Sequence, residues 1–317
     1  MKTASIRAWG MANGAAAGAL WGIVFLFPAV LHGFTPLELC LGRYLAYGVI
    51  SLCLLLPRLR ETVRRLERRD WVTLIWLSLA GNLVYYLFVA IAVQAAGGAA
   101  TSLIVGLVPL VIALIAARDA GSVPLHRLAP ALALSLAGVA LIAYQAQAPA
   151  SGSLPWPTRI GGLLCAVGAL LSWSAYSIGN SRALGRRPDL SGHEWSLLTG
   201  AVTGVLALFL APVAMAMQTD THGASAWSTF WIASVGVAVL ASVVGNACWN
   251  RASRALPLSL SGQMIVFETL FALLYSFVWQ GRWPTVVECL AIVCLLAGVV
   301  LCTRAHARYG TVVTSHG

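Results

Sequence analysis

The sequence predicts an all-α membrane protein: ten transmembrane helices in an inverted repeat of five plus five, with both termini in the cytoplasm. Composition is the first observation behind this prediction. Of the 317 residues, 59% are hydrophobic and only 9% are charged, and the mean hydropathy is +0.84. Soluble proteins carry about 25% charged residues. The other two observations are the spacing of the apolar segments and the placement of the arginines.

Ten apolar segments are each long enough to cross the hydrocarbon core, which takes roughly 20 residues of helix. The connections between them are short, so little chain remains for a soluble domain. Strands of a β-barrel would alternate in polarity over about ten residues, whereas these segments are longer and apolar on all sides. The predicted spans are residues 9–31, 35–57, 71–94, 98–117, 128–147, 159–181, 194–217, 227–250, 258–280 and 284–303.

Lysine and arginine gather at the ends of alternate spans. If the chain starts in the cytoplasm, 17 of the 20 basic residues fall on the cytoplasmic side. Arg159 and Arg282 fall outside, and Arg43 lies within the second span. Because cytoplasmic loops of membrane proteins are enriched in Lys and Arg, this bias predicts that both termini are cytoplasmic. It also explains the net charge of +10 without a nucleic-acid partner.

The two halves of the chain look like copies of each other. LSLAGVALI (134–142) matches CLLAGVVLC (294–302), and aligning the fourth span with the ninth places Pro109 against Glu268. Each half holds an odd number of helices, so the second copy enters the membrane upside down. Inverted repeats of this kind are typical of secondary transporters, which bind substrate near the midplane between the repeats. The expected units are residues 1–150 and residues 151–317.

Short motifs along the chain resemble a known family of ten-helix transporters. They are Thr35, Pro36 and Arg43 in the second span, S-L-I-x-x-L-x-P in the fourth, and L-A-G-V near the end of each half. On these motifs the chain resembles the drug/metabolite transporter superfamily, and within it the EamA-type exporters. FETLFALLY followed by QGRWPT (280–285) is similar to the aromatic amino-acid exporter branch. One departure is Glu268, which stands where EamA-type proteins usually have a proline.

The resemblance implies a multi-pass protein of the bacterial inner (plasma) membrane that exports aromatic and other neutral amino acids. It also implies alternating access through a central cavity surrounded by helices 1, 3, 4, 6, 8 and 9. The residues themselves support only an amphiphilic organic substrate, so a multidrug or other metabolite exporter remains an alternative. The expected partners are therefore a small-molecule substrate and the lipid bilayer.

Glu268 is a carboxylate at the centre of the apolar run QMIVFETLFALLY (263–275). It lies about eleven residues into the ninth span, roughly 15 Å from either end at 1.5 Å per residue. A charge at this depth costs from about 3 to more than 10 kcal/mol, so it should face the bundle interior or water. We predict that Glu268 faces a cavity and either attracts a substrate ammonium or carries a proton. The competing explanation is a buried carboxylate that braces helix packing.

Polar and aromatic side chains on other spans complete the predicted site. Asn82 lies near mid-membrane, where an amide must find hydrogen-bond partners, and Tyr85 and Tyr86 suit a flat, half-polar ligand. Trp21 and Trp173 lie away from the span ends, where an aromatic belt explains most of the twelve tryptophans. Helix packing is the competing explanation for each. The predicted substrate-binding residues are Glu268, Asn82, Tyr85, Tyr86, Trp21, Trp173, Tyr176, Met264 and Tyr275.

Three residues are predicted to gate access or to shape the bundle. Pro109 removes a backbone hydrogen bond and kinks the fourth span, and Asn246 is a candidate for an inner gate. Arg43 lies too deep to reach water easily; a structural role is favoured over substrate contact, with Glu268 as a candidate partner. Small residues on the first span would allow another helix to approach closely: Gly14, Gly18 and Gly22.

The sequence contains no motif for catalysis or cofactor binding. His193-Glu194 has no second histidine at zinc-protease spacing, and neither G-x-S-x-G nor a P-loop occurs. The cysteines show no metal-type spacing. We therefore expect no enzyme activity, no cofactor and no metal. A membrane-embedded enzyme would need several reactive groups at one depth, and a channel would need polar residues at every level of its pore.

Overall fold

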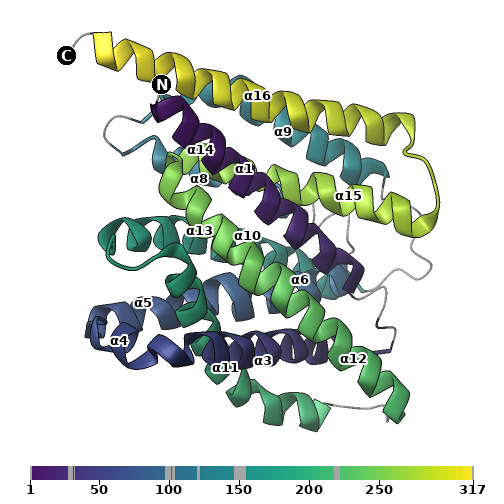
Figure 1. The fold of residues 1–317 in the computed structure, drawn as a ribbon. Coiled ribbons are helices and arrows are strands. Elements are labelled where there is room, and N and C mark those ends of the chain that lie inside the picture. Colours follow the sequence, from purple (N-terminus) through teal and green to yellow (C-terminus); the bar gives the residue numbers. More distant parts are fainter. Residues whose placement is uncertain are drawn as a thin grey trace.

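The computed structural model of the chain describes residues 2–27, 31, 33–96, 101, 104–119, 122–145, 155–217 and 222–315. These residues form a bundle of helices (Figure 1). The helices, with short 3-10 segments (η1, η2) and π-helical segments (η3, η4), are α1 (Lys2–Gly22), η1 (Ile23–Leu26), α3 (Pro36–Leu55), η2 (Leu56–Arg58), α4 (Leu59–Arg64), α5 (Arg68–Ser78), η3 (Leu79–Leu83), α6 (Val84–Ala96), α8 (Val108–Ala116), α9 (Leu125–Gln145), α10 (Trp156–Arg186), α11 (Gly192–Met217), α12 (Ala224–Val237), η4 (Ala238–Gly245), α13 (Asn246–Ala255), α14 (Leu258–Met264), α15 (Val266–Gln280) and α16 (Val286–Ser315).

Eight helical stretches in the described part of the chain are long and apolar enough to span a membrane. They match eight of the ten predicted spans. The predicted spans 9–31 and 98–117 are not among them, and both run into residues outside the described ranges, as does the end of span 128–147. Several helices also extend beyond the predicted limits. Thus α1 already begins at Lys2, because the polar ends of a span can continue as helix outside the apolar core.

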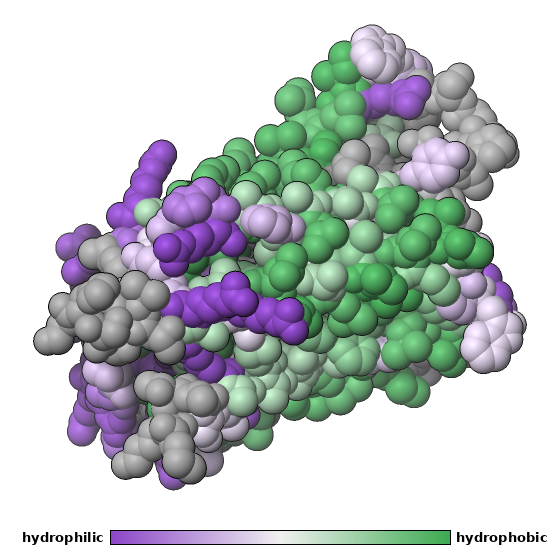
Figure 2. Space-filling view, turned by 90° about the horizontal axis from the view of Figure 1, so that it is seen from above, coloured by the Kyte–Doolittle hydropathy of each residue, from purple (hydrophilic) through white to green (hydrophobic). Residues whose placement is uncertain are grey.

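Hydrophilic side chains gather at one end of the molecule, and a broad hydrophobic belt follows (Figure 2). The arginine-rich α4 and the start of α5 lie at this end, together with both ends of the chain (Figure 1). This distribution is the one that a membrane-spanning bundle requires, because apolar side chains face lipid while charged ones remain in water.

Local sequence determines where two of the spans begin. The Thr35 Oγ1 atom accepts a hydrogen bond from the backbone N–H of Glu38, and the Glu38 carboxylate accepts one from the N–H of Thr35 at 2.7 Å. Thr285 and Glu288 repeat this capping box before α16. Each box satisfies backbone N–H groups that the first turn of a helix leaves free. The Thr35-Pro36 motif of the second span is therefore a helix start.

Helices from the two halves of the chain pack in matching pairs. α3 packs on α11, and α9 lies beside α16 (Figure 1). α1 packs on α13, η4 and α15, while α10 packs on α6, η3 and α8. In the numbering of the predicted spans, helix 1 contacts helices 8 and 9, and helix 6 contacts helices 3 and 4. These are the contacts that a two-fold relation between the halves would produce.

Two glycines at matching positions of the L-A-G-V motif form the contact between α9 and α16. A Cβ atom on Gly138 would lie 2.7 Å from the Leu295 side chain, and one on Gly298 would lie 2.4 Å from the Ser135 hydroxyl. Neither position has room for a side chain. The motif therefore serves close packing of two helices, as small residues commonly do in membranes.

Four helices around the centre of the bundle are irregular, again in matching pairs. The π-helical segment η3 joins α5 to α6 and contains Gly81-Asn82, while η4 joins α12 to α13 and ends just before Asn246. The ninth span is divided at Ile265 into α14 and α15. In the fourth span, a turn at residues 106–107 precedes α8, and Pro109 lies in the first turn of that helix. Such interruptions often mark functional sites.

Candidate functional site

A central cavity of about 510 Å³ lies among the irregular helices. Six of the nine residues predicted to bind substrate line it, and so do Arg43 and Asn246, which were predicted to gate or to shape the bundle. The remaining lining comes from α3, η3, α6 and the segment between α1 and α3. The residues that line the cavity are Trp21, Val24, Phe34, Pro36, Leu39, Arg43, Tyr44, Gly81, Asn82, Tyr85, Tyr86, Val89, Ala90, Trp173, Asn246 and Glu268.

The break in the ninth span determines the position of Glu268. Because α14 ends at Met264 and α15 begins at Val266, Glu268 lies in the first turn of α15, where its N–H donates to the Ile265 carbonyl at 3.0 Å. Ile265 keeps helical dihedral angles (φ −61°, ψ −25°), and the N–H groups of Ile265 and Glu268 bond three residues back instead of four. The ninth span is thus locally tightened just before Glu268.

The α1 helix lies directly against this first turn. A Cβ atom on Gly18 would lie only 2.7 Å from the backbone nitrogen of Glu268, and one on Gly14 would lie 2.7 Å from the Met264 side chain. The predicted close approach at the glycine stripe is therefore present, and its partner is the divided ninth span. This contact joins the first half of the chain to the segment that carries the carboxylate.

Arg43 also faces the cavity. Its Nε–H donates to the Ser242 hydroxyl of η4 at 3.1 Å, and its guanidinium carbon lies 5.1 Å from the centre of the Tyr44 ring. No ion pair joins Arg43 to Glu268 or to any other described carboxylate, so the expected pairing of the two does not form. The cavity wall therefore carries a guanidinium and a carboxylate that do not neutralise each other directly.

Two asparagines at matching positions hold the irregular helices in place. The Asn82 amide donates to the Thr203 hydroxyl at 3.0 Å, and the Asn246 amide donates to the Tyr47 hydroxyl at 3.3 Å. Both side chains line the cavity. Asn246 thus lines the central cavity, and its role at an inner gate stays a prediction.

Aromatic rings from three helices, α1, α6 and α10, form a connected cluster beside Glu268. The Trp21 and Trp173 rings meet edge to face at 5.4 Å between centroids, and the Tyr85 ring lies 4.9 Å from that of Trp173. The Trp21 indole N–H donates to the Ala241 carbonyl at 3.0 Å. A π-helical segment leaves such carbonyls without a regular helical partner, so this tryptophan both supports η4 and lines the cavity.

Three predicted site residues lie away from the cavity. Tyr176 covers Gly81, Met264 is packed against α1, and the Tyr275 hydroxyl donates to the Ala19 carbonyl at 3.0 Å. They were assigned to the site on the assumption that the sixth and ninth spans present one continuous face each. The break at Ile265 removes that assumption for Met264, which precedes it.

A second cavity, of about 320 Å³, lies on the other side of Glu268. It shares four lining residues with the central cavity, namely Tyr85, Val89, Trp173 and Glu268. Its other walls come from α8 and the residues before it, α9, Ile265, α15 and α16, and they include Pro109. Sequence reasoning missed this cavity, because part of its wall belongs to α9 and α16, helices 5 and 10, which the family resemblance treats as peripheral.

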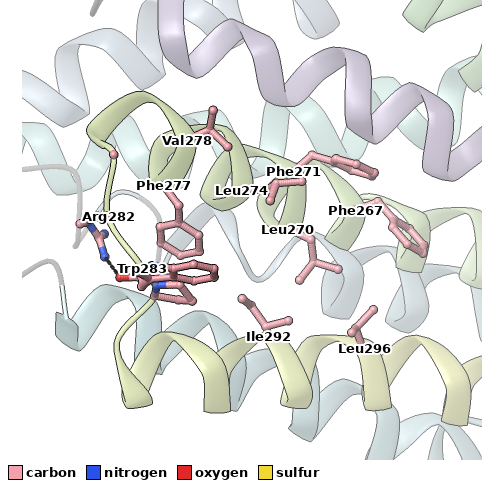
Figure 3. Close-up of a pocket in the computed structure, with 12 residues that line it drawn as sticks. Phe267, Leu270, Phe271, Leu274, Phe277, Val278, Arg282, Trp283, Ile292 and Leu296 are labelled. Atoms are coloured by element: carbon pink, nitrogen blue, oxygen red, sulfur yellow. Dashed lines mark hydrogen bonds between the residues drawn. The ribbon is translucent and has the colours of Figure 1, made fainter.

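A groove of about 690 Å³ between α15 and α16 is larger than either cavity, but apart from Arg282 its lining residues are uncharged and mostly apolar (Figure 3). Phe267, Leu270 and Phe271 line it from one face of α15. Arg282 lies at its end, but both carboxylate oxygens of Glu288 engage that guanidinium, at 2.7 and 2.8 Å. The groove contains none of the predicted site residues, so we place the site at the central cavity.

Hydrogen bonds and ion pairs join helices at the arginine-rich end of the bundle, and one of them, between Arg187 and Asp70, links the two halves. Within the second half, the Asn180 amide donates to the side-chain oxygen of Asn250 at 2.8 Å, and the Trp195 indole N–H donates to the Asn180 side-chain oxygen at 3.0 Å. Nearer the surface, Arg187 pairs with Asp70 and with Asp189. The hydrogen bond from Arg187 lowers the pKa of Asp189 to about 2. Asn250, which also donates to the Gly192 carbonyl at 3.1 Å, is thus part of this network.

Interrupted helices that meet at an enclosed, partly charged cavity are characteristic of secondary transporters. The comparison with protein families agrees: the chain belongs to the EamA-like transporter family, whose model matches twice, at residues 8–144 and 160–304. The chain is also similar to the inner membrane protein YtfF of Escherichia coli (strain K12), with 34% identity over 301 residues that cover 91% of this chain and 93% of that protein. It is therefore a multi-pass inner membrane protein.

The fold itself has a solved counterpart. A crystal structure that is 20% identical in sequence superposes with a TM-score of 0.74 over 94% of this chain and 98% of that chain. At this identity the likeness concerns the fold alone.

Proposed function

We propose that the protein exports neutral amino acids, aromatic ones among them, by alternating access through the central cavity. The observation that carries this proposal is the presence of Arg43 and Glu268 on the wall of one 510 Å³ cavity without an ion pair between them. An amino-acid zwitterion brings a carboxylate for the guanidinium and an ammonium for the carboxylate.

Electrostatics favours a zwitterion over an ion of one sign. A charge away from bulk water is costly unless it is paired and hydrogen-bonded. A zwitterion bound between Arg43 and Glu268 satisfies both charges, whereas a cationic drug would leave Arg43 unpaired and close to a like charge. Arg43 therefore disfavours the multidrug alternative, which Glu268 alone would have supported.

The aromatic walls support the range of side chains. Trp21, Trp173 and Tyr85 offer ring faces and edges to an aromatic side chain. The resemblance of FETLFALLY and QGRWPT to the aromatic amino-acid exporter branch also supports aromatic amino acids as substrates.

Alternating access would use the two units, residues 1–150 and 151–317, as inverted halves around the cavity. The paired helix contacts and the two family matches support this division. The cavity is lined by Phe34, just before α3, and by Pro36, the first residue of α3, while the ion pair between Arg187 and Asp70 joins the two halves at the arginine-rich end. We infer a state open to the outside and closed to the cytoplasm, with both termini in the cytoplasm.

Transport by purified protein in liposomes tests the proposal. Neutral amino acids and a cationic dye would be loaded, and efflux measured for the wild type and for Glu268→Gln and Arg43→Gln. Both substitutions should lower amino-acid efflux at least about tenfold, since each removes one charge-assisted hydrogen bond to the substrate. Glu61→Gln is the matched control, because Glu61 is an exposed carboxylate paired with Arg65 on α4. A wild type that moves the dye but no amino acid would refute the proposal.

A further inference from the structure

The cavity behind Glu268 is an apolar compartment that opens from the central cavity. The two share Tyr85, Val89, Trp173 and Glu268, so they meet at the carboxylate and at the contact between the Tyr85 and Trp173 rings. Every charged group on the two walls belongs to the central cavity or to Glu268 itself. A ligand that spans both would therefore have its polar end on one side and its apolar end on the other.

The two faces of α15 line different cavities. Phe267, Leu270, Phe271 and Leu274 face the outer groove (Figure 3), while Glu268, Thr269, Ala272 and Leu273 line the compartment. Residues three and four apart share one face of a helix. The α15 helix is thus a wall with the compartment on one side and the membrane-facing groove on the other.

The walls of the compartment are mostly aliphatic, with Thr101, Ser135, Thr269 and Glu268 among their polar side chains. Val105, Pro109, Val139, Ile142 and Leu295 supply aliphatic surface from α8, α9, α16 and the turn before α8. The hydroxyl of Ser135, one of few polar groups on the wall, already accepts a hydrogen bond from the Gln263 amide and donates one to the Ala131 carbonyl. Aliphatic side chains thus make up most of the wall away from Glu268, and such surfaces bind apolar groups.

The volume fits a large side chain. A cavity of roughly 150 Å³ lined by aliphatic and aromatic residues accepts a benzene ring. The compartment has about 320 Å³, so it has room for a branched aliphatic chain, a phenyl ring or an indole. The central cavity, in contrast, holds the guanidinium of Arg43 and the amides of Asn82 and Asn246.

We infer that this compartment is the side-chain subsite: it receives the apolar side chain of the amino acid whose charged head lies between Arg43 and Glu268. The inference rests on the proposed function and adds to it the residues that select side-chain size. Val139 and Ile142 on α9 set the depth of the subsite, and Tyr85 and Trp173 lie at the boundary between the subsite and the central cavity. Helices 5 and 10, represented by α9 and α16, therefore take part in substrate selection.

Substitutions that fill the compartment test the inference. Val139→Phe and Ile142→Phe each place a ring in the subsite, and Leu136→Phe is the matched control, because Leu136 is on the same helix but 37% exposed on the outer surface. Competition by phenylalanine, leucine, alanine and serine would be measured for each variant in liposomes. Both filling variants should weaken competition by phenylalanine and leucine by about 10- to 100-fold and leave alanine and serine within about twofold.

The possible failures have different signatures. Filling variants that weaken all four amino acids equally, or none of them, while the wild type transports amino acids would overturn the subsite and leave the proposed function standing. A wild type that transports no amino acid would overturn both. A filling variant that no longer folds is replaced by Val139→Ala and Ile142→Ala, which enlarge the subsite and should improve competition by tryptophan over that by alanine.

Discussion

The contact between α1 and the divided ninth span makes a quantitative prediction about Gly18. In Gly18→Ala the new methyl group would lie 2.6 Å from the Phe267 Cβ atom and 2.7 Å from the Glu268 nitrogen. Carbon atoms in contact prefer a separation of roughly 3.5 Å or more. Because two of the nearest atoms belong to the backbone of α15, the contact cannot be relieved by a change of rotamer. The helices must move apart.

The size of the effect follows from a matched pair of variants. Overpacking of a tight contact costs about 1–3 kcal/mol, while replacing glycine by alanine inside a helix gains about 1 kcal/mol. Gly161→Ala on α10 shares the second effect but not the first, because nothing lies within 4 Å of its added methyl group. The difference in free energy of unfolding between the two variants should therefore be about 1–3 kcal/mol, with Gly18→Ala the less stable.

Reversible unfolding in mixed micelles would measure this difference, with transport in liposomes as a second readout. Gly18→Ala should also lower transport, because the displaced backbone carries Glu268. Equal unfolding free energies for the two variants would refute the close packing of α1 on the ninth span.

Two further predictions concern the ends of the bundle. Arg187 lowers the pKa of Asp189 from an ordinary 3.8 to about 2, so the ion pair contributes stability that is complete above about pH 4 and is lost as pH falls toward 2. Because Asp189 is half exposed, this contribution is under about 1 kcal/mol. The variant Arg187→Ala should therefore unfold in acid at a higher pH than the wild type, which circular dichroism would record. In a background without the seven native cysteines, a cysteine at Trp283 should react with an impermeant maleimide from outside and one at Arg68 only after permeabilisation; the reverse result would invert the orientation.

Patterns that depend on neighbouring residues were readable from the sequence. The apolar runs predict eight spans that the described structure contains, and the glycine stripe of the first span predicts a close helix contact. Glu268 and Asn82 were selected because a charged or amide side chain in the middle of a span is costly unless it meets water or a hydrogen-bond partner. Trp21 and Trp173 were selected because they lie away from the span ends, where tryptophans are usual. All four line the central cavity.

Features that depend on distant residues were not readable. Arg43 is held by Ser242, which is 199 positions away in the sequence, so its place on the cavity wall could not be foreseen from the second span alone. No proline lies beside Ile265 to indicate the irregularity of the ninth span. Because the sequence analysis treated that span as one regular helix, it assigned Met264 to the wrong face. The π-helical segments did leave a signal: a Gly-Asn pair at residues 81–82 and again at residues 245–246.

Binding of substrate analogues tests the central claim most directly, because each analogue lacks one charge of the zwitterion. Affinities of phenylalanine, phenylalanine amide and 3-phenylpropanoate would be measured for the wild type, Arg43→Gln and Glu268→Gln. Arg43→Gln should weaken phenylalanine by about 10- to 150-fold but leave the amide unchanged, and Glu268→Gln should weaken phenylalanine but not 3-phenylpropanoate. If Arg43→Gln weakens the amide as much as phenylalanine, the guanidinium does not bind the carboxylate, and the account is contradicted.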